Sequence, residues 1–243
     1  MRVVFKSLLR TFRDTLPPRI QTRLAALRSF RNPILLGQRA FVHPSVQILG
    51  RAFVRIGLNS ILSQDCWLNV NHRTGKKLAI IIGDHCFIGR RNFFSSGKRI
   101  EFGHYVLTAN DCHFLGSSHN TENPLLPCIT TGTTDTDTIN VGHNTFIGAG
   151  ARIIGDVSIG HGCIIGACSL VIYDIPPFSK VAGFPATARS RYSFIQKKWI
   201  PVSDFTADDE LALPDAETYL KHLLKYPPPR MPYLAAGNDM GEC

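Results

Sequence analysis

Large aliphatic residues recur at every sixth position through much of this chain. The longest run consists of Val141, Ile147, Ile153, Ile159, Ile165 and Val171. A helix repeats its buried face every three to four residues and a strand alternates every second residue, so neither produces this spacing. The six-residue period instead predicts a repeating unit of one short strand and one turn.

Shorter runs with the same period precede the long one. They are Val42, Ile48 and Val54; Ile56, Leu62 and Leu68; Ile82, Ile88 and Phe94; and Phe102, Thr108 and Phe114. The first residue of each unit is expected to point inward, a glycine often follows it, and a small residue lies four positions on. Three units predict one triangular coil, and stacked coils place the aliphatic side chains in ladders inside a parallel β-helix. The handedness of that helix does not follow from these residues.

Two segments interrupt the repeat, at 69–79 and at 116–139. The second is polar and contains Pro124 and Pro127, and long excursions from a regular scaffold are commonly functional. We therefore expect a basic helical N-terminal extension (1–40), a β-helix domain (41–190) with an excursion loop (116–139), and a C-terminal cap and tail (191–243). Within the cap, the segment 215–226 predicts a short helix.

The net charge of +9 is concentrated at one end of the chain, because residues 1–40 hold nine basic residues against one acidic residue. The remainder is nearly neutral, which argues against a nucleic-acid-binding protein. Residues 1–31 predict a helical cap with a solvated basic face, and the alternative is a peripheral contact with an anionic membrane. Apolar runs are too short for a membrane helix, and the N-terminus lacks the apolar stretch of a signal peptide. We expect a cytoplasmic protein, at the inner membrane face if the lipid contact exists.

The seven cysteines form no C-x-x-C pair. Four of them, Cys66, Cys86, Cys112 and Cys163, occupy the small-residue position of the repeat. We predict that they are small buried residues and that they form no disulfide or metal site.

The repeats are followed by further motifs in a fixed order. These are FIGA (146–149), IGACS (165–169), DIPP (174–177) and AGFPA (182–186). Over about residues 42–190 this set resembles the hexapeptide-repeat acyltransferases, in particular the branch that contains maltose, galactoside and chloramphenicol acetyltransferases and the O-acetyltransferases of bacterial surface polysaccharides. The resemblance implies an all-β fold, a left-handed parallel β-helix with short helical N- and C-terminal extensions. It also implies a homotrimer and acetyl-CoA as co-substrate, bound between neighbouring subunits without a metal.

The resemblance further implies a histidine general base on or beside an excursion loop. The matching segment HFLGSSHNTENP (113–124) places His119 first and His113 second. A sugar hydroxyl is a weak nucleophile at neutral pH, and an imidazole can remove its proton during attack on a thioester carbonyl. Because a thioester is already activated, neither a metal nor a covalent enzyme intermediate is required.

The resemblance also implies the donor contacts, whereas the candidate acceptor contacts are chosen because they lie near the same end of the coils. The positions that match acetyl-CoA contacts are Gly148, Ala149, Ala167, Gly183 and Pro185, and Arg189 and Arg191 are candidates for the CoA phosphates because Thr187 stands where the family often has a basic residue. Small residues are also required at tight coil corners, which is the alternative interpretation of these positions. The candidate acceptor contacts are Asn92, Ser95 and Asn110.

The sequence therefore predicts an acetyl-CoA-dependent O-acetyltransferase that modifies a sugar hydroxyl of a bacterial surface glycan or its precursor by direct transfer in a ternary complex. One alternative is an acetyltransferase for an amino sugar, serine or an antibiotic. Others are a non-catalytic β-helix protein and a zinc enzyme in which His104, His113 and His119 converge. The DIPP and AGFPA segments argue against the zinc enzyme.

Overall fold

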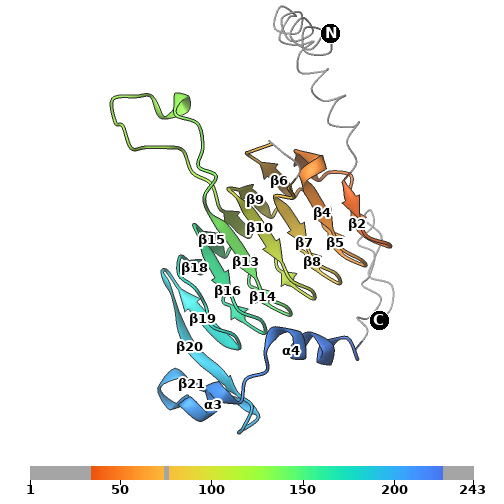
Figure 1. Cartoon of the computed structure of the whole chain (residues 1–243), viewed down its shortest axis with the longest axis vertical. Helices are drawn as coiled ribbons and strands as arrows, with labels where there is room; N and C mark the ends of the chain where they lie inside the picture. Colours follow the sequence, from red (N-terminus) through yellow and green to blue (C-terminus); the bar gives the residue numbers. More distant parts are fainter. Residues whose placement is uncertain (1–33, 74–76, 227–243) are drawn as a thin grey trace, which may run out of the picture.

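The computed structural model describes residues 34–73 and 77–226, and these form a prism of three parallel sheets (Figure 1). The first sheet contains β1 (Leu35–Leu36), β4 (Val54–Ile56), β7 (Ile80–Ile82), β10 (Arg99–Phe102), β13 (Thr138–Val141) and β16 (Val157–Ile159). The second contains β2 (Phe41–Val42), β5 (Ile61–Leu62), β8 (Phe87–Ile88), β11 (Leu107–Thr108), β14 (Phe146–Ile147), β17 (Ile164–Ile165) and β19 (Ser179–Gly183). The third contains β3 (Gln47–Leu49), β6 (Trp67–Val70), β9 (Phe93–Ser96), β12 (His113–Leu115), β15 (Arg152–Ile154) and β18 (Leu170–Val171).

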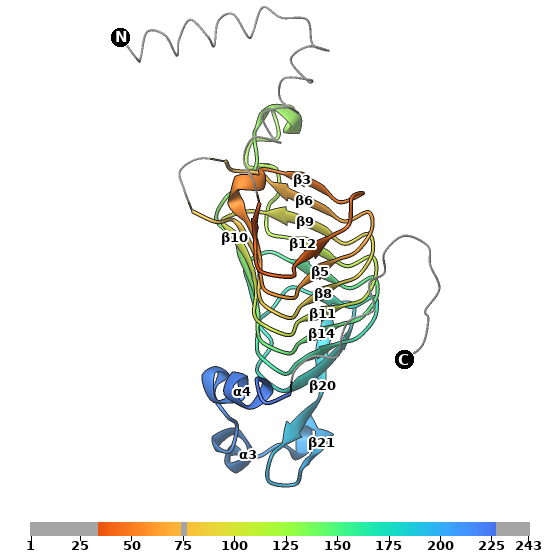
Figure 2. The ribbon, with the colours of Figure 1, turned by 90° about the vertical axis from the view of Figure 1, so that its right-hand side faces the viewer.

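Each coil of the chain contributes one strand to each sheet in turn, and successive coils stack on one another (Figure 2). The fold is the left-handed parallel β-helix that the family resemblance implies. The predicted helical N-terminal extension lies outside the described residues up to position 33. We refer below to the three edges of the prism by the two sheets that meet there.

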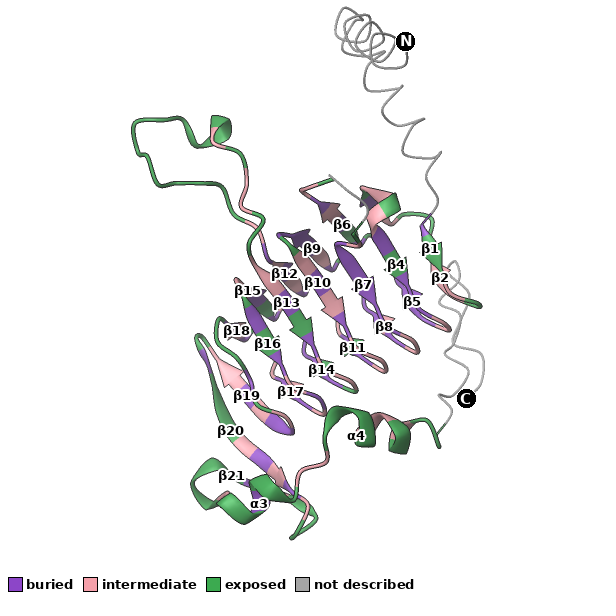
Figure 3. Ribbon diagram, in the orientation of Figure 1, coloured by how far each residue is buried: buried purple, intermediate pink, exposed green. Residues whose placement is uncertain are grey.

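The six-residue aliphatic ladders form the core (Figure 3). In the third sheet the inward column consists of Ile48, Leu68, Phe94, Phe114, Ile153 and Val171, which are in register from coil to coil. Burying one such side chain contributes about 1.5–3 kcal/mol. Every predicted inward residue is buried except Val42, which is partly exposed in the first coil.

The small-residue position behaves as predicted for the cysteines. Cys66, Cys86, Cys112 and Cys163 are buried and free. Burial raises the pKa of the Cys86 thiol to about 12 and that of Cys66 to about 11. These thiols are therefore protonated core residues at neutral pH.

The glycines at the coil corners allow adjacent coils to approach each other. A Cβ on Gly83 would lie 2.2 Å from the carbonyl oxygen of Gly103 in the next coil. No side chain fits in that space, so the glycine after the inward residue follows from coil stacking.

Beyond β19 the chain reverses into an antiparallel extension, β20 (Ala186–Ser193) and β21 (Lys198–Pro201), followed by α3 (Ala207–Leu211) and α4 (Ala216–Leu223). The helix predicted at 215–226 is confirmed as α4, and Asp215 caps it by accepting a hydrogen bond from the Thr218 amide. The two antiparallel strands were not predicted. The excursion loop ends at residue 137, two residues earlier than expected, because β13 begins at Thr138. It extends away from the prism, with the short 3₁₀ helix Cys128–Thr130 near its tip (Figure 1).

Candidate functional site

The predicted donor-binding residues lie at one edge of the prism, where the second and third sheets meet. Ala149 follows β14 and Ala167 follows β17, and these corners stack, because the Cys168 amide donates to the Ala149 carbonyl at 2.8 Å. In the two preceding coils the matching positions hold Arg90 and Asn110. The side chains at this edge therefore shrink from Arg and Asn to Ala in the later coils, where Ala149 and Ala167 are exposed.

The glycines at the same edge have structural requirements of their own. A Cβ on Gly148 would lie 2.5 Å from the amide nitrogen of Ala167, so coil stacking alone demands glycine there. Gly183 has a φ of 115°, in the region that favours glycine, and the following Phe184–Pro185 peptide bond is cis. The turn extends the edge one coil further, since the Gly183 amide donates to the Ser169 hydroxyl at 3.3 Å. Gly148, Ala149, Ala167, Gly183 and Pro185 thus lie along one edge.

The two candidate arginines are two residues apart on β20, but their guanidinium groups point toward opposite ends of its pairing with β19. A Cβ on Gly183 would lie 3.4 Å from the Arg189 guanidinium, so Arg189 is beside the candidate donor edge and is exposed. Arg191 pairs with Ser179 at the other end, where it is buried, donates to the Pro177 carbonyl and forms an ion pair with Glu210. The structure does not bring Arg191 to the donor edge, and its guanidinium holds the C-terminal cap.

His113 lies on the outer face of the third sheet, directly after the candidate donor edge. It is in register with Phe93 in one neighbouring coil and Arg152 in the other. Partial burial lowers the pKa of His113, the positive charge of Arg152 lowers it further, and Asp111 partly offsets these effects. A neutral imidazole at physiological pH is the form that can accept a proton.

His119 lies at the base of the excursion loop, at the edge where the third and first sheets meet. Its backbone forms an antiparallel bridge with Thr133 on the returning arm, and its side chain is exposed. The Thr133 hydroxyl lies 3.3 Å from Nε2 of His72, which also contacts the Thr134 carbonyl at 3.1 Å. His72 therefore ties the loop after β6 to the excursion loop beside His119. Sequence reasoning missed His72, because it lies in an interruption of the repeat.

The three predicted acceptor residues do not form one surface. Asn92 is 1% exposed, and its amide donates to the Gly89 and Ala109 carbonyls while its oxygen accepts from the Cys112 amide. It occupies the inward small-residue position, so the prediction that it contacts an acceptor is wrong. Asn110 caps the Arg90 amide at the donor edge. Ser95 lies on the outer face of the third sheet, where it accepts a hydrogen bond from Asn71.

The edge between the first and second sheets carries a column of Asp84, His104, His143 and His161. The Asp84 amide donates to Nδ1 of His104 at 3.0 Å, and the His104 amide donates to Nδ1 of His143 at 2.9 Å. His104 and His143 therefore satisfy corner amides. His104 lies on a different edge from His113 and His119, so the three do not converge as the zinc alternative required. Within the described residues no three His, Cys, Asp or Glu side chains gather in a metal-binding arrangement.

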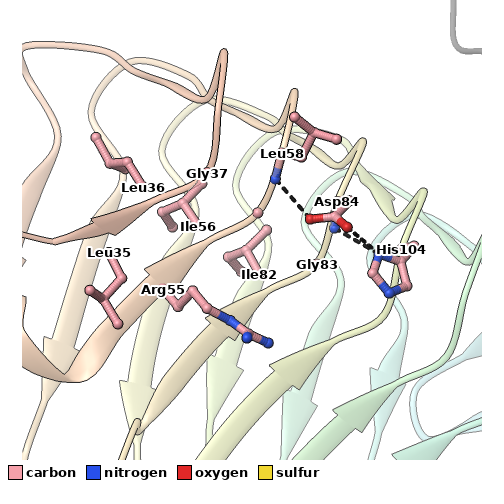
Figure 4. Close-up of a pocket in the computed structure, with 11 residues that line it drawn as sticks. Leu35, Leu36, Gly37, Arg55, Ile56, Leu58, Ile82, Gly83, Asp84 and His104 are labelled. Atoms are coloured by element: carbon pink, nitrogen blue, oxygen red, sulfur yellow. Dashed lines mark hydrogen bonds and ion pairs between the residues drawn. The ribbon is translucent and has the colours of Figure 1, made fainter.

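A cavity of about 350 Å³ opens on this same edge (Figure 4). Leu35, Leu36 and Leu58 give it an apolar wall, Arg55 and Asp84 supply charged groups, and His104 adds an imidazole ring. Asp84 accepts a hydrogen bond from the Leu58 amide at 2.8 Å and faces His104, so both groups hold the corner together. None of the predicted donor, acceptor or base residues lines this cavity.

Comparison with known proteins agrees with the repeat and the fold. A family profile described as bacterial transferase hexapeptide (six repeats) matches residues 138–172. A search of curated protein sequences gives no significant match. A variant of the N-acyltransferase AntD from Bacillus cereus, in complex with dTDP and coenzyme A, has a similar structure, with a TM-score of 0.55, 18% identity, and coverage of 67% of this chain and 86% of AntD.

Two further solved structures are similar. AntD in complex with dTDP and 3-hydroxybutyryl-CoA gives a TM-score of 0.54 with the same identity and coverage. A maltose O-acetyltransferase from Clostridium difficile 630 gives a TM-score of 0.43 at 23% identity, covering 75% of this chain and 81% of that protein. The resemblance to the hexapeptide-repeat acyltransferases is confirmed.

Proposed function

We propose that this protein is an acetyl-CoA-dependent O-acetyltransferase that modifies a sugar hydroxyl of a bacterial surface glycan or its precursor. The observation that carries the proposal is the edge between the second and third sheets, where Ala149 and Ala167 replace the larger residues of earlier coils. An extended pantetheine arm needs such a strip, with backbone amides and carbonyls accessible and no side chains across it. Arg189 lies at its far end, where a cation would meet the CoA phosphates.

The chemistry requires one base and one donor to the oxyanion. An imidazole removes the proton of the sugar hydroxyl as its oxygen attacks the thioester carbonyl, and the tetrahedral intermediate then expels the CoA thiolate, which takes up that proton. We assign the base to His119, with His113 as the second candidate. His113 is the second candidate because its pKa is lowered and because it lies beside the donor edge.

The likeness to AntD supports acyl transfer from CoA on this fold and also raises a second acceptor class. AntD is described as an N-acyltransferase and has been solved with dTDP-4-amino-4,6-dideoxyglucose. An amino sugar is therefore the alternative acceptor for this chain. The products separate the two cases, because hydroxylamine cleaves an O-acetyl ester and leaves an N-acetyl amide intact.

A homotrimer is part of the proposal, with the second sheet as the subunit contact. The outward column of this sheet is apolar in six successive coils, with Phe41, Ile61, Phe87, Leu107, Phe146 and Ile164 in register. Covering this sheet would enclose the adjacent donor edge between two subunits.

The described residues contain no helix that is long and apolar enough to cross a membrane. A cytoplasmic location and a peripheral membrane contact through residues 1–31, which lie outside the described part, remain proposals.

The test is transfer of isotopically labelled acetyl groups from acetyl-CoA to a panel of sugars, read by mass spectrometry. Replacing the base lowers kcat by about 10²- to 10⁴-fold, while acetyl-CoA binding measured by calorimetry is unchanged. We expect this result for His119→Ala. The same loss in His113→Ala, with His119→Ala active, would move the base to His113. No calorimetric binding of acetyl-CoA to the wild-type protein would contradict the proposed function.

A further inference from the structure

The outer face of the third sheet carries an aromatic column. Trp67, Phe93 and His113 are in register on three successive coils. The Trp67 and Phe93 ring centroids are 5.0 Å apart, and the His113 ring meets Phe93 edge-on at 6.0 Å. Trp67 is 43% exposed, so a large aromatic surface faces outward. The repeat could have revealed this column, because each member directly precedes an inward residue of the third sheet.

Polar side chains run beside the aromatic column, two residues further along the same strands. Asn69 and Ser95 are in register, and both connect to Asn71. The Asn69 amide donates to the Asn71 oxygen at 2.6 Å, and the Asn71 amide donates to the Ser95 hydroxyl at 2.9 Å. Ser95 is only 8% exposed and holds Asn71 in place, so Asn69 and Asn71, which are partly exposed, are the polar groups that can meet a ligand.

We propose that this surface, formed by Trp67, Phe93, Asn69 and Asn71 and called here the sugar platform, binds the pyranose ring of the acceptor. A pyranose presents an apolar C–H face and a rim of hydroxyls. Aromatic rings pack against the first, and amide and hydroxyl groups bind the second. A row of rings beside a row of amides matches both.

The two candidate bases lie at opposite ends of the sugar platform. His113 continues the aromatic column into the next coil, on the side of the third sheet that adjoins the donor edge. At the other end, Asn71 is followed by His72, which contacts the Thr133 hydroxyl, and Thr133 bridges the backbone of His119. A sugar on the platform would therefore have a histidine at either end. This inference rests on the proposed function and specifies its acceptor site. Neither the cavity in Figure 4 nor Asn92 is part of that site.

Tryptophan fluorescence can detect sugar binding even though the natural acceptor is unidentified. The chain has two tryptophans, Trp67 and Trp199, and Trp199 packs against Tyr192 and Lys180 in the C-terminal extension. In a Trp199→Phe variant only Trp67 reports. We expect at least one of methyl α-glucoside, methyl β-galactoside and N-acetylglucosamine to change its emission saturably, and glycerol, which has no ring, to leave it unchanged. No saturable change with any of the three sugars would overturn the proposal.

Kinetics on the best acceptor provide the second readout. Trp67→Ala should raise the KM for the sugar about tenfold or more, a loss of about 1.4 kcal/mol of binding, with the KM for acetyl-CoA unchanged. Trp67→Phe, which keeps a ring, should restore most of the affinity. The mass of the oligomer is measured by light scattering for each variant. If Trp67→Ala dissociates the oligomer, this face is a subunit interface and the sugar platform is wrong. Failure of the wild-type protein to bind acetyl-CoA would count against the proposed function alone, because the fluorescence titration needs no donor.

Discussion

Asn92 shows how a single polar side chain can be part of the core of this fold. It replaces the small residue of its repeat, and its amide group bonds to the backbone of the corner and to the Thr108 hydroxyl, which is also buried. Its oxygen accepts the Cys112 amide of the next coil at 2.6 Å. Asn92 therefore links two coils from inside.

Removing this side chain should affect stability and leave sugar binding unchanged. In Asn92→Ala the Cys112 amide loses a buried partner, so we expect the free energy of unfolding to fall by about 1–3 kcal/mol. Asn110→Ala is the matched control, because Asn110 caps the Arg90 amide at an exposed corner and water can replace it. Urea unfolding of both variants measures the difference. An equal loss of unfolding free energy in the two variants, or a raised KM for the acceptor in Asn92→Ala, would contradict the assignment of Asn92 to the core.

At the scale of single residues, the six-residue period correctly predicted which positions point inward. The wrong predictions concern residues whose type is unusual for their position in the repeat. The period alone places Asn92 inward, but its polarity suggested a binding role. Arg191 was interpreted as a phosphate ligand from its distance to the AGFPA turn along the chain. Its ion pair with Glu210 depends on how β20 and α3 fold back, which no repeat encodes.

Among the elements, the edge between the first and second sheets depends on the protonation state of its histidines. His143 accepts the His104 amide through Nδ1, and their rings stack with centroids 5.1 Å apart. Burial lowers the pKa of His143, and the neighbouring His104 and His161 lower it further. His161 is only 8% exposed because α4 covers it, where it contacts the Pro214 carbonyl and packs against Tyr219.

Acid should therefore destabilise this edge. Because the pKa of His143 is lower in the folded chain than the value of about 6.5 expected on unfolding, the unfolded chain takes up the proton first as the pH falls. The stabilisation is fully present above about pH 6.5 and decreases as the pH falls toward the folded value. Urea unfolding at about pH 7.5 and about pH 5.5 measures this change. In His143→Asn the new side chain can still accept the His104 amide but does not titrate, so this variant should lose less unfolding free energy between the two pH values. A loss identical to that of the wild-type protein would rule out His143 as the source of the acid sensitivity.

The elements of the prism could be predicted because each follows from a local period, whereas the C-terminal extension could not. Its strand β20 pairs antiparallel with β19 and β21 pairs antiparallel with β20, and no six-residue spacing marks either strand. The excursion loop was recognised as an interruption, but its arms are joined by contacts such as Ser118 with Thr134 that periodicity does not specify. The candidate donor edge was predictable, since Ala149 and Ala167 hold equivalent positions of successive coils.

At the scale of the whole molecule, large apolar side chains are exposed on the second sheet and on the excursion loop. On the second sheet Leu107 is 41% exposed and Phe146 is 39% exposed, and they are neighbours in register. On the excursion loop Leu125 and Ile129 are 89% and 87% exposed. Contiguous exposed apolar patches commonly mark protein interfaces, which agrees with the proposed trimer.

A charge on the second sheet should separate the subunits. Burying Glu at position 107 or 146 against another subunit would place an unpaired charge in an apolar contact. We expect Leu107→Glu and Phe146→Glu to convert the trimer to monomer in light scattering, while circular dichroism shows an intact β-helix. Asn140→Glu, on the exposed face of the first sheet, is the control. A trimer that persists in both second-sheet variants would place the interface elsewhere.

The proposed function is tested most directly by determining whether bound acetyl-CoA covers the edge between the second and third sheets. Two cysteines of the described residues are exposed, Cys168 beside Ala167 at that edge and Cys128 on the excursion loop. Their alkylation rates with iodoacetamide are followed by mass spectrometry of peptides, with and without acetyl-CoA at about ten times its dissociation constant. We predict that acetyl-CoA slows alkylation of Cys168 about tenfold, leaves Cys128 unchanged, and has no effect in an Ala167→Trp variant whose edge is blocked. Unchanged alkylation of Cys168 at saturating acetyl-CoA would contradict the account.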